Sequence, residues 1–270
     1  MDKYLDMPLI TIIIAVFNGA KTLQRCLDSI YKQNYPCIEI IIMDGASTDG
    51  SFDILKFNHN KISYWESRSD NGIYHAWNKA LEHVHGDWVC FLGADDYFWD
   101  INVLELMVPQ LNAVSTNTKV VYGKVAMVSV NNEVIKIIGE SWVITQRNLL
   151  RKMCLPHQGV MHHRTMFESR GKFDESFKIS GDYELLLREL KTGNANFVGE
   201  IIVAGMQVGG VSNSFNNIHR YISEEMRARK KNGLPLNCVF SYLRMLYIYS
   251  KILKLFFENK FKYLLEIIKR

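Results

Sequence analysis

The sequence predicts an α/β protein whose central sheet is mostly parallel and has helices on both faces. Residues 9–16 form a continuous, largely β-branched run, and a strand so uniformly apolar is covered on both sides, as in a parallel sheet. A helical pattern follows this run, and a second apolar run occupies residues 38–43. Strand, helix and strand joined by short links make a βαβ unit.

The rest of the first hundred residues continues this alternation. The first helix has one apolar face, made by Leu23, Leu27, Ile30 and Tyr31. Residues 62–66 fit a third strand, and a second helix begins after Gly72. The apolar face of that helix carries Ile73, Ala76, Trp77, Ala80, Leu81 and Val84. It leads into residues 88–92, an apolar run of strand-favouring side chains.

The next hundred residues have a more mixed pattern. Residues 101–112 fit a helix, and residues 120–128 and 134–138 fit two strands around a turn. The remaining predicted elements are a short strand ending at Met161, a helix beginning near Ser180, a strand over 197–204 and a loop over 209–213.

Composition places the chain among ordinary globular proteins. Its 270 residues, 48% of them hydrophobic and 22% charged, are enough to bury a substantial core. The five cysteines include no Cys-x-x-Cys pair, which indicates reduced thiols in a cytosolic protein. The first residues lack a basic stretch followed by an apolar core, so we expect no secretory signal.

The net charge of +4 is unevenly distributed. Residues 226–270 contain eleven Lys or Arg and two Glu, a balance of +9, so residues 1–225 carry −5. An acidic body argues against nucleic acid as a partner. Between Val239 and Arg270 apolar residues recur at helical spacing among basic ones, without an uncharged stretch long enough to span a bilayer. We expect basic amphipathic helices on an anionic membrane surface, with packing on the body or on a partner as the alternative.

Carboxylates follow two of the predicted strands. Asp44 comes directly after the second strand, and the adjacent pair Asp95 and Asp96 follows residues 88–92. Ligands of open α/β sheets bind at the carboxyl ends of the strands. Two adjacent ionised carboxylates repel each other unless a cation or strong donors lie between them. The pair therefore favours a metal site that carries an anionic ligand over a simple helix cap.

Six short segments stand in an order and spacing that resembles family 2 glycosyltransferases, in particular small bacterial enzymes that build surface polysaccharides. The segments are residues 16–18, 44–51, 69–74, 76–79, 93–96 and 180–184. The resemblance covers roughly residues 8–213 and implies the GT-A fold. In that fold a Rossmann-like, nucleotide-sugar-binding half, here 1–100, is fused to an acceptor-binding half, here 101–213. The region 214–270 would add the basic amphipathic helices.

The resemblance also implies roles for individual residues. Asp44 would hold the base or ribose of a nucleoside-diphosphate sugar, and Asp95 would lie nearer the ribose or sugar. Asp96 would bind Mn²⁺ or Mg²⁺ bridging the diphosphate. The rest of the donor pocket would be formed by Val16, Phe17, Asn18, Gly45, Asp70, Asn71, Gly72, Asn78 and His157. The alternative to ligand contact for residues 47–49 is a helix N-cap. The alternative for His157 is a histidine buried in the core.

Transfer to a hydroxyl needs a base, because an alcohol is a poor nucleophile until its proton is removed. Asp182 matches the family's catalytic Asp, although Asp is also an ordinary N-cap. The resemblance thus implies an inverting glycosyltransferase that acts on a saccharide or lipid-linked saccharide in O-antigen, capsule or exopolysaccharide biosynthesis. We expect it in the cytoplasm, peripheral on the inner face of the cytoplasmic membrane.

Three other classes of protein fit less well. A sugar-nucleotide nucleotidyltransferase would have a Gly-rich, basic loop after the first strand. Residues 17–21 contain too few glycines and basic residues for such a loop. A non-catalytic nucleotide- or sugar-binding module would not need both Asp96 and Asp182. A dinucleotide dehydrogenase is disfavoured because no Gly-x-Gly-x-x-Gly follows a strand.

Overall fold

The computed structural model describes residues 7–209 and 217–236, together with Leu243, Leu246 and Ser250. The strands in this part of the chain are β1 Ile10–Val16, β2 Ile38–Asp44, β3 Tyr64–Ser67, β4 Trp88–Gly93, β5 Tyr97–Phe98, β6 Val120–Val128, β7 Val134–Ile138, β8 Val160–His163 and β9 Ala195–Gln207. The α-helices are α1 Ala20–Tyr31, α2 Ser51–Asn58, α3 Ile73–Ala80, α4 Val103–Ala113, α5 Trp142–Leu149, α6 Thr165–Arg170, α7 Gly181–Leu190 and α8 Ile218–Lys231.

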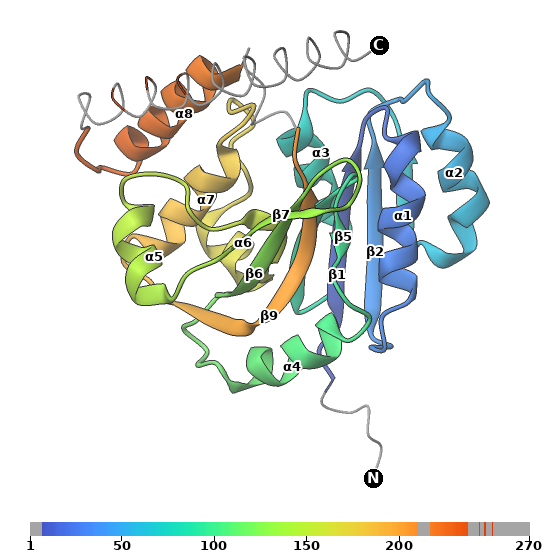
Figure 1. Ribbon diagram of the computed structural model, residues 1–270, viewed down its shortest axis with the longest axis horizontal. Coiled ribbons are helices and arrows are strands. Elements are labelled where there is room, and N and C mark those ends of the chain that lie inside the picture. Colours follow the sequence, from blue (N-terminus) through green and yellow to red (C-terminus); the bar gives the residue numbers. More distant parts are fainter. Residues whose placement is uncertain (1–6, 210–216, 237–242, 244–245, 247–249, 251–270) are drawn as a thin grey trace, which may run out of the picture.

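All these strands belong to one sheet, which helices flank on both sides (Figure 1). The order is β3-β2-β1-β4-β8-β6-β9-β5, and β7 pairs with β6. The first four strands are parallel throughout, whereas β8 joins β4 and β6 in antiparallel orientation. The sheet is then parallel again between β6 and β9. The expected α/β class is confirmed, and strands from both halves of the chain share the sheet.

The register of the parallel strands brings the expected carboxylates to one edge. Val16 at the end of β1 pairs with Asp44 of β2, and Ala15 pairs with Gly93 of β4. Because the three strands run in the same direction and end level, the residues that follow them meet at the same edge.

The core lies on both faces of the sheet, which explains the unbroken apolar character of β1. Ile12 and its alternate neighbours pack with residues of α1 and α4, such as Leu27 and Met107. Ile13 points to the opposite face and packs with residues of α3 and α7, such as Trp77. Successive side chains of a strand point to opposite faces, so a strand covered on both sides is apolar at every position.

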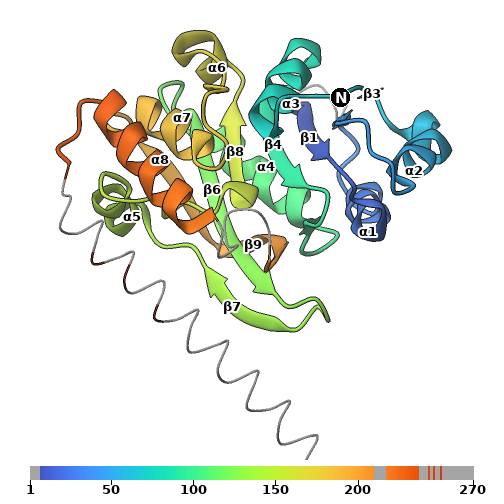
Figure 2. The same cartoon turned by 90° about the horizontal axis from the view of Figure 1, so that it is seen from above.

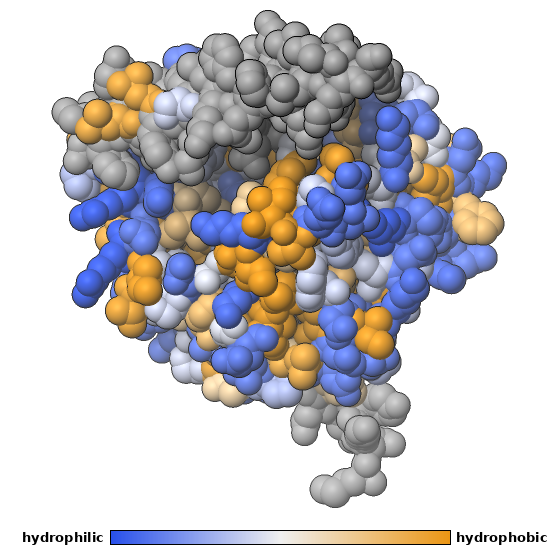
Figure 3. All heavy atoms as spheres, in the orientation of Figure 1, coloured by the Kyte–Doolittle hydropathy of each residue, from blue (hydrophilic) through white to orange (hydrophobic). Residues whose placement is uncertain are grey.

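The hairpin of β6 and β7 extends from the body of the sheet (Figure 2). Within the described residues β7 pairs only with β6, and hydrophobic surface gathers over this part of the molecule in Figure 3. Three large side chains of β7 contribute to it: Val134, Ile135 and Ile137 are 50%, 58% and 46% exposed.

Every strand and helix that the sequence predicted in residues 7–209 is present, with shifts of a few residues at the ends. Four short elements were not predicted: α2, β5, α5 and α6. β5 has only two residues, and α5 buries only Thr145 and Leu149, so neither leaves a recognisable hydrophobic period.

The C-terminal region is described only in part. α8 packs against α7 and precedes the segment at 239–270 for which membrane binding or packing is expected. The amphipathic helices predicted between Val239 and Arg270 lie outside the described residues, apart from Leu243, Leu246 and Ser250. Residues 210–213 of the predicted loop also lie outside the described residues.

The search for membrane spans, confined to the described residues, finds no helix with the length and apolar character that crossing a bilayer requires. In the same part of the chain the cysteines are free thiols, as expected: Cys26, Cys37, Cys90 and Cys154.

Candidate active site

Two loops are joined at the edge where β1 and β2 end. The backbone N–H of Asn18 donates to Ser47 Oγ (2.7 Å), and the N–H of Thr48 donates to Asn18 Oδ1 (2.9 Å). Asn18 and Ala46 have positive φ angles of 52° and 62°. This conformation costs a residue other than glycine about 1–2 kcal/mol, and it persists where the surrounding contacts enforce it, commonly at functional sites.

Asp49 holds the starts of the two helices that follow these loops. Its carboxylate accepts the N–H of Ala20 (2.9 Å) and both the N–H (3.1 Å) and the hydroxyl (2.7 Å) of Ser51. The hydrogen bond from the Ser51 hydroxyl and that from Ala20 lower the pKa of Asp49. Asp49 thus accepts N–H groups at the start of both helices, although their N-cap residues are Gly19 and Gly50. Ser47 instead donates to a different carboxylate.

That carboxylate is Asp44, which is 2% exposed at the end of β2. It accepts hydrogen bonds from the hydroxyl and the N–H of Ser47 and from the hydroxyl of Ser67 (2.6 Å). Donors from the loop after β2 and from the end of β3 thus fix the orientation of the side chain.

Phe17, Gly45 and Asp70 lie together beside Asp44. A Cβ on Gly45 would stand 2.8 Å from Asp70 Oδ2 and 3.3 Å from Phe17 Cδ2, so glycine allows this close approach. The N–H of Gly45 donates to the carbonyl of Val16 (2.8 Å), and the other oxygen of Asp70 accepts the N–H of Gly72 (2.8 Å). The Phe17 ring is 71% exposed, so it presents a free aromatic face at this edge.

Asp95 and Asp96 form the turn that ends β4. The N–H of Gly93 donates to Asp96 Oδ2 (2.9 Å), and the N–H of Asp96 donates to Gly93 O (3.0 Å). A Cβ on Gly93 would lie 2.7 Å from Asp95 Oδ1 and 2.8 Å from Asp96 Oδ2. The two carboxylates therefore converge over the backbone of Gly93, in space that any other residue would fill.

Asp96 is 3% exposed, and its environment opposes ionisation. Burial, followed by the charge of Asp95, raises its pKa from 3.8 to about 7. The N–H of Gly93, the Gln158 side chain and the backbone of Gln207 act in the opposite direction without cancelling the shift. A cation beside the pair would favour the ionised form.

The donor set fits a divalent metal ion that arrives together with a phosphate ligand. Within the described residues no three His, Cys, Asp or Glu side chains gather into a metal site made by protein alone. Mg²⁺ in phosphate-handling enzymes is usually bound by one or two carboxylates, with substrate phosphates and water completing the shell. Asp96, with Asp95 beside it, supplies that partial set.

Arg25 of α1 supports this turn, a role that sequence reasoning did not assign. Its guanidinium donates to the carbonyl of Asp95 (2.6 Å), to Gln207 Oε1 (3.1 Å) and to Asn132 Oδ1 (2.5 Å). It also lies 4.7 Å from the centre of the Tyr97 ring. All these partners are at least 70 residues away in sequence, so no local pattern marks Arg25.

Asp182, in the first turn of α7, lies beside Tyr74, and Lys178 shortly before it contacts Asn71. Tyr74 of α3 places its hydroxyl 3.2 Å from Asp182 Oδ1, and Lys178 Nζ donates to the carbonyl of Asn71 (2.6 Å). Burial is the main cause that raises the pKa of Asp182 from 3.8 to about 6, with a smaller contribution from the charge of Glu225. A carboxylate with a pKa near neutrality is suited to act as a general base.

Asn78 and His157 are placed differently from the other expected donor residues. The buried carboxamide of Asn78 exchanges hydrogen bonds with the backbone of Phe173 and donates to Glu175 Oε1 (2.8 Å), so it ties α3 to the loop at 173–175. His157 is 6% exposed, its Nε2 lies 3.1 Å from that of His162, and burial lowers its pKa to about 3. These are the contacts of structural side chains.

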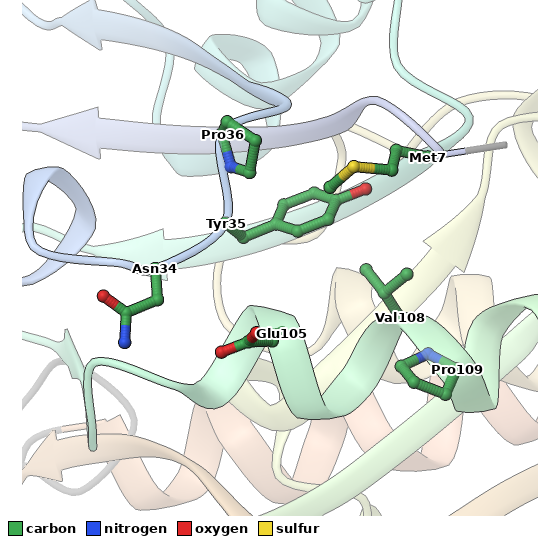
Figure 4. A pocket seen from close by; sticks show the side chains of 7 residues that line it. All are labelled: Met7, Asn34, Tyr35, Pro36, Glu105, Val108 and Pro109. Carbon is green, nitrogen blue, oxygen red and sulfur yellow. The ribbon is translucent and has the colours of Figure 1, made fainter. Parts of the chain in front are cut away.

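A hollow of about 390 Å³ lies away from all these groups (Figure 4). Its lining is Met7, Asn34, Tyr35, Pro36, Glu105, Val108 and Pro109. Met7 and Pro36 precede β1 and β2, so the hollow is at the amino ends of the strands. Among the described residues of its lining Glu105 is the only carboxylate, so these residues do not offer paired acidic groups.

A family model and several curated relatives match most of this chain. The model of the family described as Glycosyl transferase family 2 matches residues 11–177. The PGL/p-HBAD biosynthesis glycosyltransferase of Mycobacterium bovis is 27% identical over 212 residues, which are 77% of this chain and 80% of the relative. An uncharacterized glycosyltransferase of Rickettsia typhi is 26% identical over 202 residues, 73% of this chain and 63% of the relative.

Two solved structures have a similar fold. TarS of S. aureus, residues 1–349 in complex with UDP-GlcNAc, superposes with a TM-score of 0.66 at 17% identity, over 86% of this chain and 69% of that one. The mannosyltransferase PcManGT from Pyrobaculum calidifontis, in complex with GDP-Man and Mn²⁺, gives a TM-score of 0.64 at 18% identity. The superposition covers 91% of this chain and 75% of that one. At these identities the likeness concerns the fold.

Proposed function

The chain belongs to glycosyl transferase family 2 and is a transferase with the GT-A fold, and from that premise we propose that it inverts the anomeric centre of its donor. In this proposal it moves a sugar from a nucleoside-diphosphate sugar to a hydroxyl of a saccharide or lipid-linked saccharide. The observation that carries the proposal is the buried Asp96, whose pKa is raised by desolvation and by Asp95 at the edge where Asp44 also lies. Such a carboxylate is suited to a cation and a polyanionic ligand.

The donor would lie along this edge. Asp44, Asp70 and the exposed ring of Phe17 would contact the nucleoside, and Asn18, Asn71 and Gly72 would line the same pocket. Asp96 would hold Mn²⁺ or Mg²⁺, with Asp95 toward the ribose or sugar. The bound metal would stabilise the negative charge that accumulates on the leaving nucleoside diphosphate.

Asp182 would act as the general base. It removes the proton of the acceptor hydroxyl while the hydroxyl oxygen bonds to the anomeric carbon and the bond from that carbon to the diphosphate oxygen breaks. The products are the glycoside, the nucleoside diphosphate and one proton, which Asp182 releases to solvent. Attack from the side opposite the leaving group inverts the configuration.

The named neighbours support a nucleotide-sugar donor, because one is a complex with UDP-GlcNAc and the other with GDP-Man and Mn²⁺. For the acceptor, the mycobacterial relative is named for PGL/p-HBAD biosynthesis, and the sequence resembles enzymes of surface polysaccharide assembly. We therefore place the acceptor among cell-surface saccharides or their lipid-linked precursors.

A thermal-shift screen tests the donor site. With Mn²⁺ present, one of a panel of nucleoside diphosphates should raise the melting temperature, by roughly 5 °C at about a hundredfold excess over its dissociation constant. The matching nucleoside without phosphates is the control and should give a smaller shift, and EDTA should reduce the effect of the diphosphate. If every nucleotide leaves the melting temperature unchanged, the proposed function is wrong.

A flotation assay tests the expectation that the basic segment at 239–270 binds an anionic membrane surface. The full chain should float with vesicles that contain phosphatidylglycerol, and a variant truncated after Leu236 should do so at least about tenfold less, because each Lys or Arg near an anionic surface contributes about 1 kcal/mol. Vesicles of phosphatidylcholine alone are the control. Equal flotation of the two proteins would contradict a membrane role for the tail.

A further inference from the structure

Helix α8 contacts residues 178–180, the segment that directly precedes Asp182 and helix α7. The carboxylate of Glu224, 8% exposed, accepts the N–H groups of three consecutive residues: Lys178 (3.0 and 3.1 Å), Ile179 (2.8 Å) and Ser180 (3.0 Å). Hydrogen bonds to a charged acceptor are among the stronger ones, and a buried N–H left without an acceptor costs about 1–3 kcal/mol. One side chain thus fixes the backbone immediately before α7.

Tyr74 of α3 contacts the same segment. Its hydroxyl has one proton to donate, and two acceptors share it: the carbonyl of Ile179 (2.7 Å) and Asp182 Oδ1 (3.2 Å). The ring is 3% exposed and sits against the start of α7, where a Cβ on Gly181 would be 2.8 Å from the ring. Glycine at position 181 is what lets the ring pack so closely that its hydroxyl reaches both groups.

We propose that Glu224 and Tyr74 are positioning residues for Asp182, so that the catalytic unit includes α8 as well as the region that matches the family. This inference rests on the proposed function for the role of Asp182. Glu224 fixes the backbone before the base, and Tyr74 fixes its carboxylate. A displacement of about 1 Å in a reacting group can cost about a hundredfold in rate, so a base at a helix start needs such support.

The two contacts act on Asp182 in different ways. Asp182 is faced by Tyr74 from α3 and by Glu225 from α8, and it accepts the N–H of Tyr183 (2.8 Å). The Tyr74 hydroxyl favours the ionised carboxylate, whereas Glu225 disfavours it. Among the described residues, the Glu224 carboxylate accepts hydrogen bonds only from the backbone N–H groups of residues 178–180. Its loss should therefore free this segment without removing a bond to Asp182 itself.

The first test needs no substrate. In Glu224→Gln, hydrogen exchange of the amides at 178–180 should accelerate at least tenfold, while Glu168→Gln, a change at an exposed residue of α6, should leave it unchanged. In Tyr74→Phe, a carbon-13 NMR titration of the Asp carboxyls should show the Asp182 midpoint moved to higher pH, with Asp182→Asn assigning the signal. Unchanged exchange in Glu224→Gln or an unchanged midpoint in Tyr74→Phe would overturn the proposal, and Glu224→Asp serves if Glu224→Gln does not fold.

The second test measures the release of UDP from UDP-GlcNAc or of GDP from GDP-Man, with Mn²⁺ and water as the acceptor. Tyr74→Phe and Glu224→Gln should lower kcat about tenfold and leave the KM for the donor unchanged, and Glu224→Asp should recover part of the loss. If Asp182→Asn is inactive but both variants turn over normally, positioning is wrong. If the exchange and titration experiments give the expected results but Asp182→Asn keeps full turnover, Asp182 is not the base and the proposed function is wrong. The contacts of Glu224 and Tyr74 with the segment around Asp182 would still be supported.

Discussion

Asp182→Asn should lower sugar transfer by about 10²–10⁴-fold, the contribution usual for a general base, and leave donor binding unchanged. The amide keeps the shape of the side chain but cannot accept the proton of the hydroxyl. The measurement is kcat for transfer, together with the thermal shift given by nucleoside diphosphate and Mn²⁺. Asp53→Asn, at an exposed position of α2, is the matched control and should retain full activity.

The pH dependence of the wild-type enzyme gives a second measurement of the same role. Because burial raises the pKa of Asp182 to about 6, the base is ionised above pH 6 and becomes protonated below it. At saturating Mn²⁺ and donor, kcat should therefore fall about tenfold per unit below pH 6, where an Asp with an ordinary pKa would sustain the rate to about pH 4. A rate that stays constant down to pH 4.5 would assign the base elsewhere.

Asp96→Asn should remove metal-dependent transfer, with a loss of about 10³-fold or more, because the variant lacks the carboxylate that holds the cation at the leaving group. The thermal shift given by nucleoside diphosphate with Mn²⁺ should shrink to that seen in EDTA. Asp100→Asn, a change at an exposed residue shortly after the same turn, is the control. Normal turnover by Asp96→Asn in the presence of chelator would refute the assignment.

The same substitution should stabilise the metal-free protein. The pKa of Asp96 is about 7 in the folded state and 3.8 as an ordinary side chain, so the unfolded chain gives up its proton first as the pH rises. The stability linked to this proton is fully present below pH 4 and is lost as the pH rises through 7, by at most about 4 kcal/mol. In EDTA, urea unfolding at pH 8 should therefore show Asp96→Asn to be more stable than the wild type, and the difference should nearly vanish at pH 4. Equal stability at pH 8 would mean that the buried charge is already compensated.

Much of the site followed from local patterns in the sequence. Apolar runs and helical periods predicted the strands that precede Asp44 and Asp96, and parallel pairing then brought both residues to one edge. The same patterns left short elements such as β5 unpredicted, because two residues carry no period. They also gave no sign that Asn78 is buried and bonded to the loop at 173–175, because these contacts depend on residues about 95 positions later in the chain.

By itself the sequence determined the order of the longer strands and helices and the sheet edge at which Asp44, Asp95 and Asp96 lie, because hydrophobic periodicity and turn residues act between near neighbours in the chain. Only the tertiary structure decided which polar groups touch. Tyr74 reaches Asp182 across 108 positions, Arg25 reaches Asp95 across 70, and Glu224 reaches Ser180 across 44. A hydrogen bond needs its two atoms within about 3.2 Å and aligned, and residues so distant in sequence meet that condition only when the packed sheet and helices bring them together.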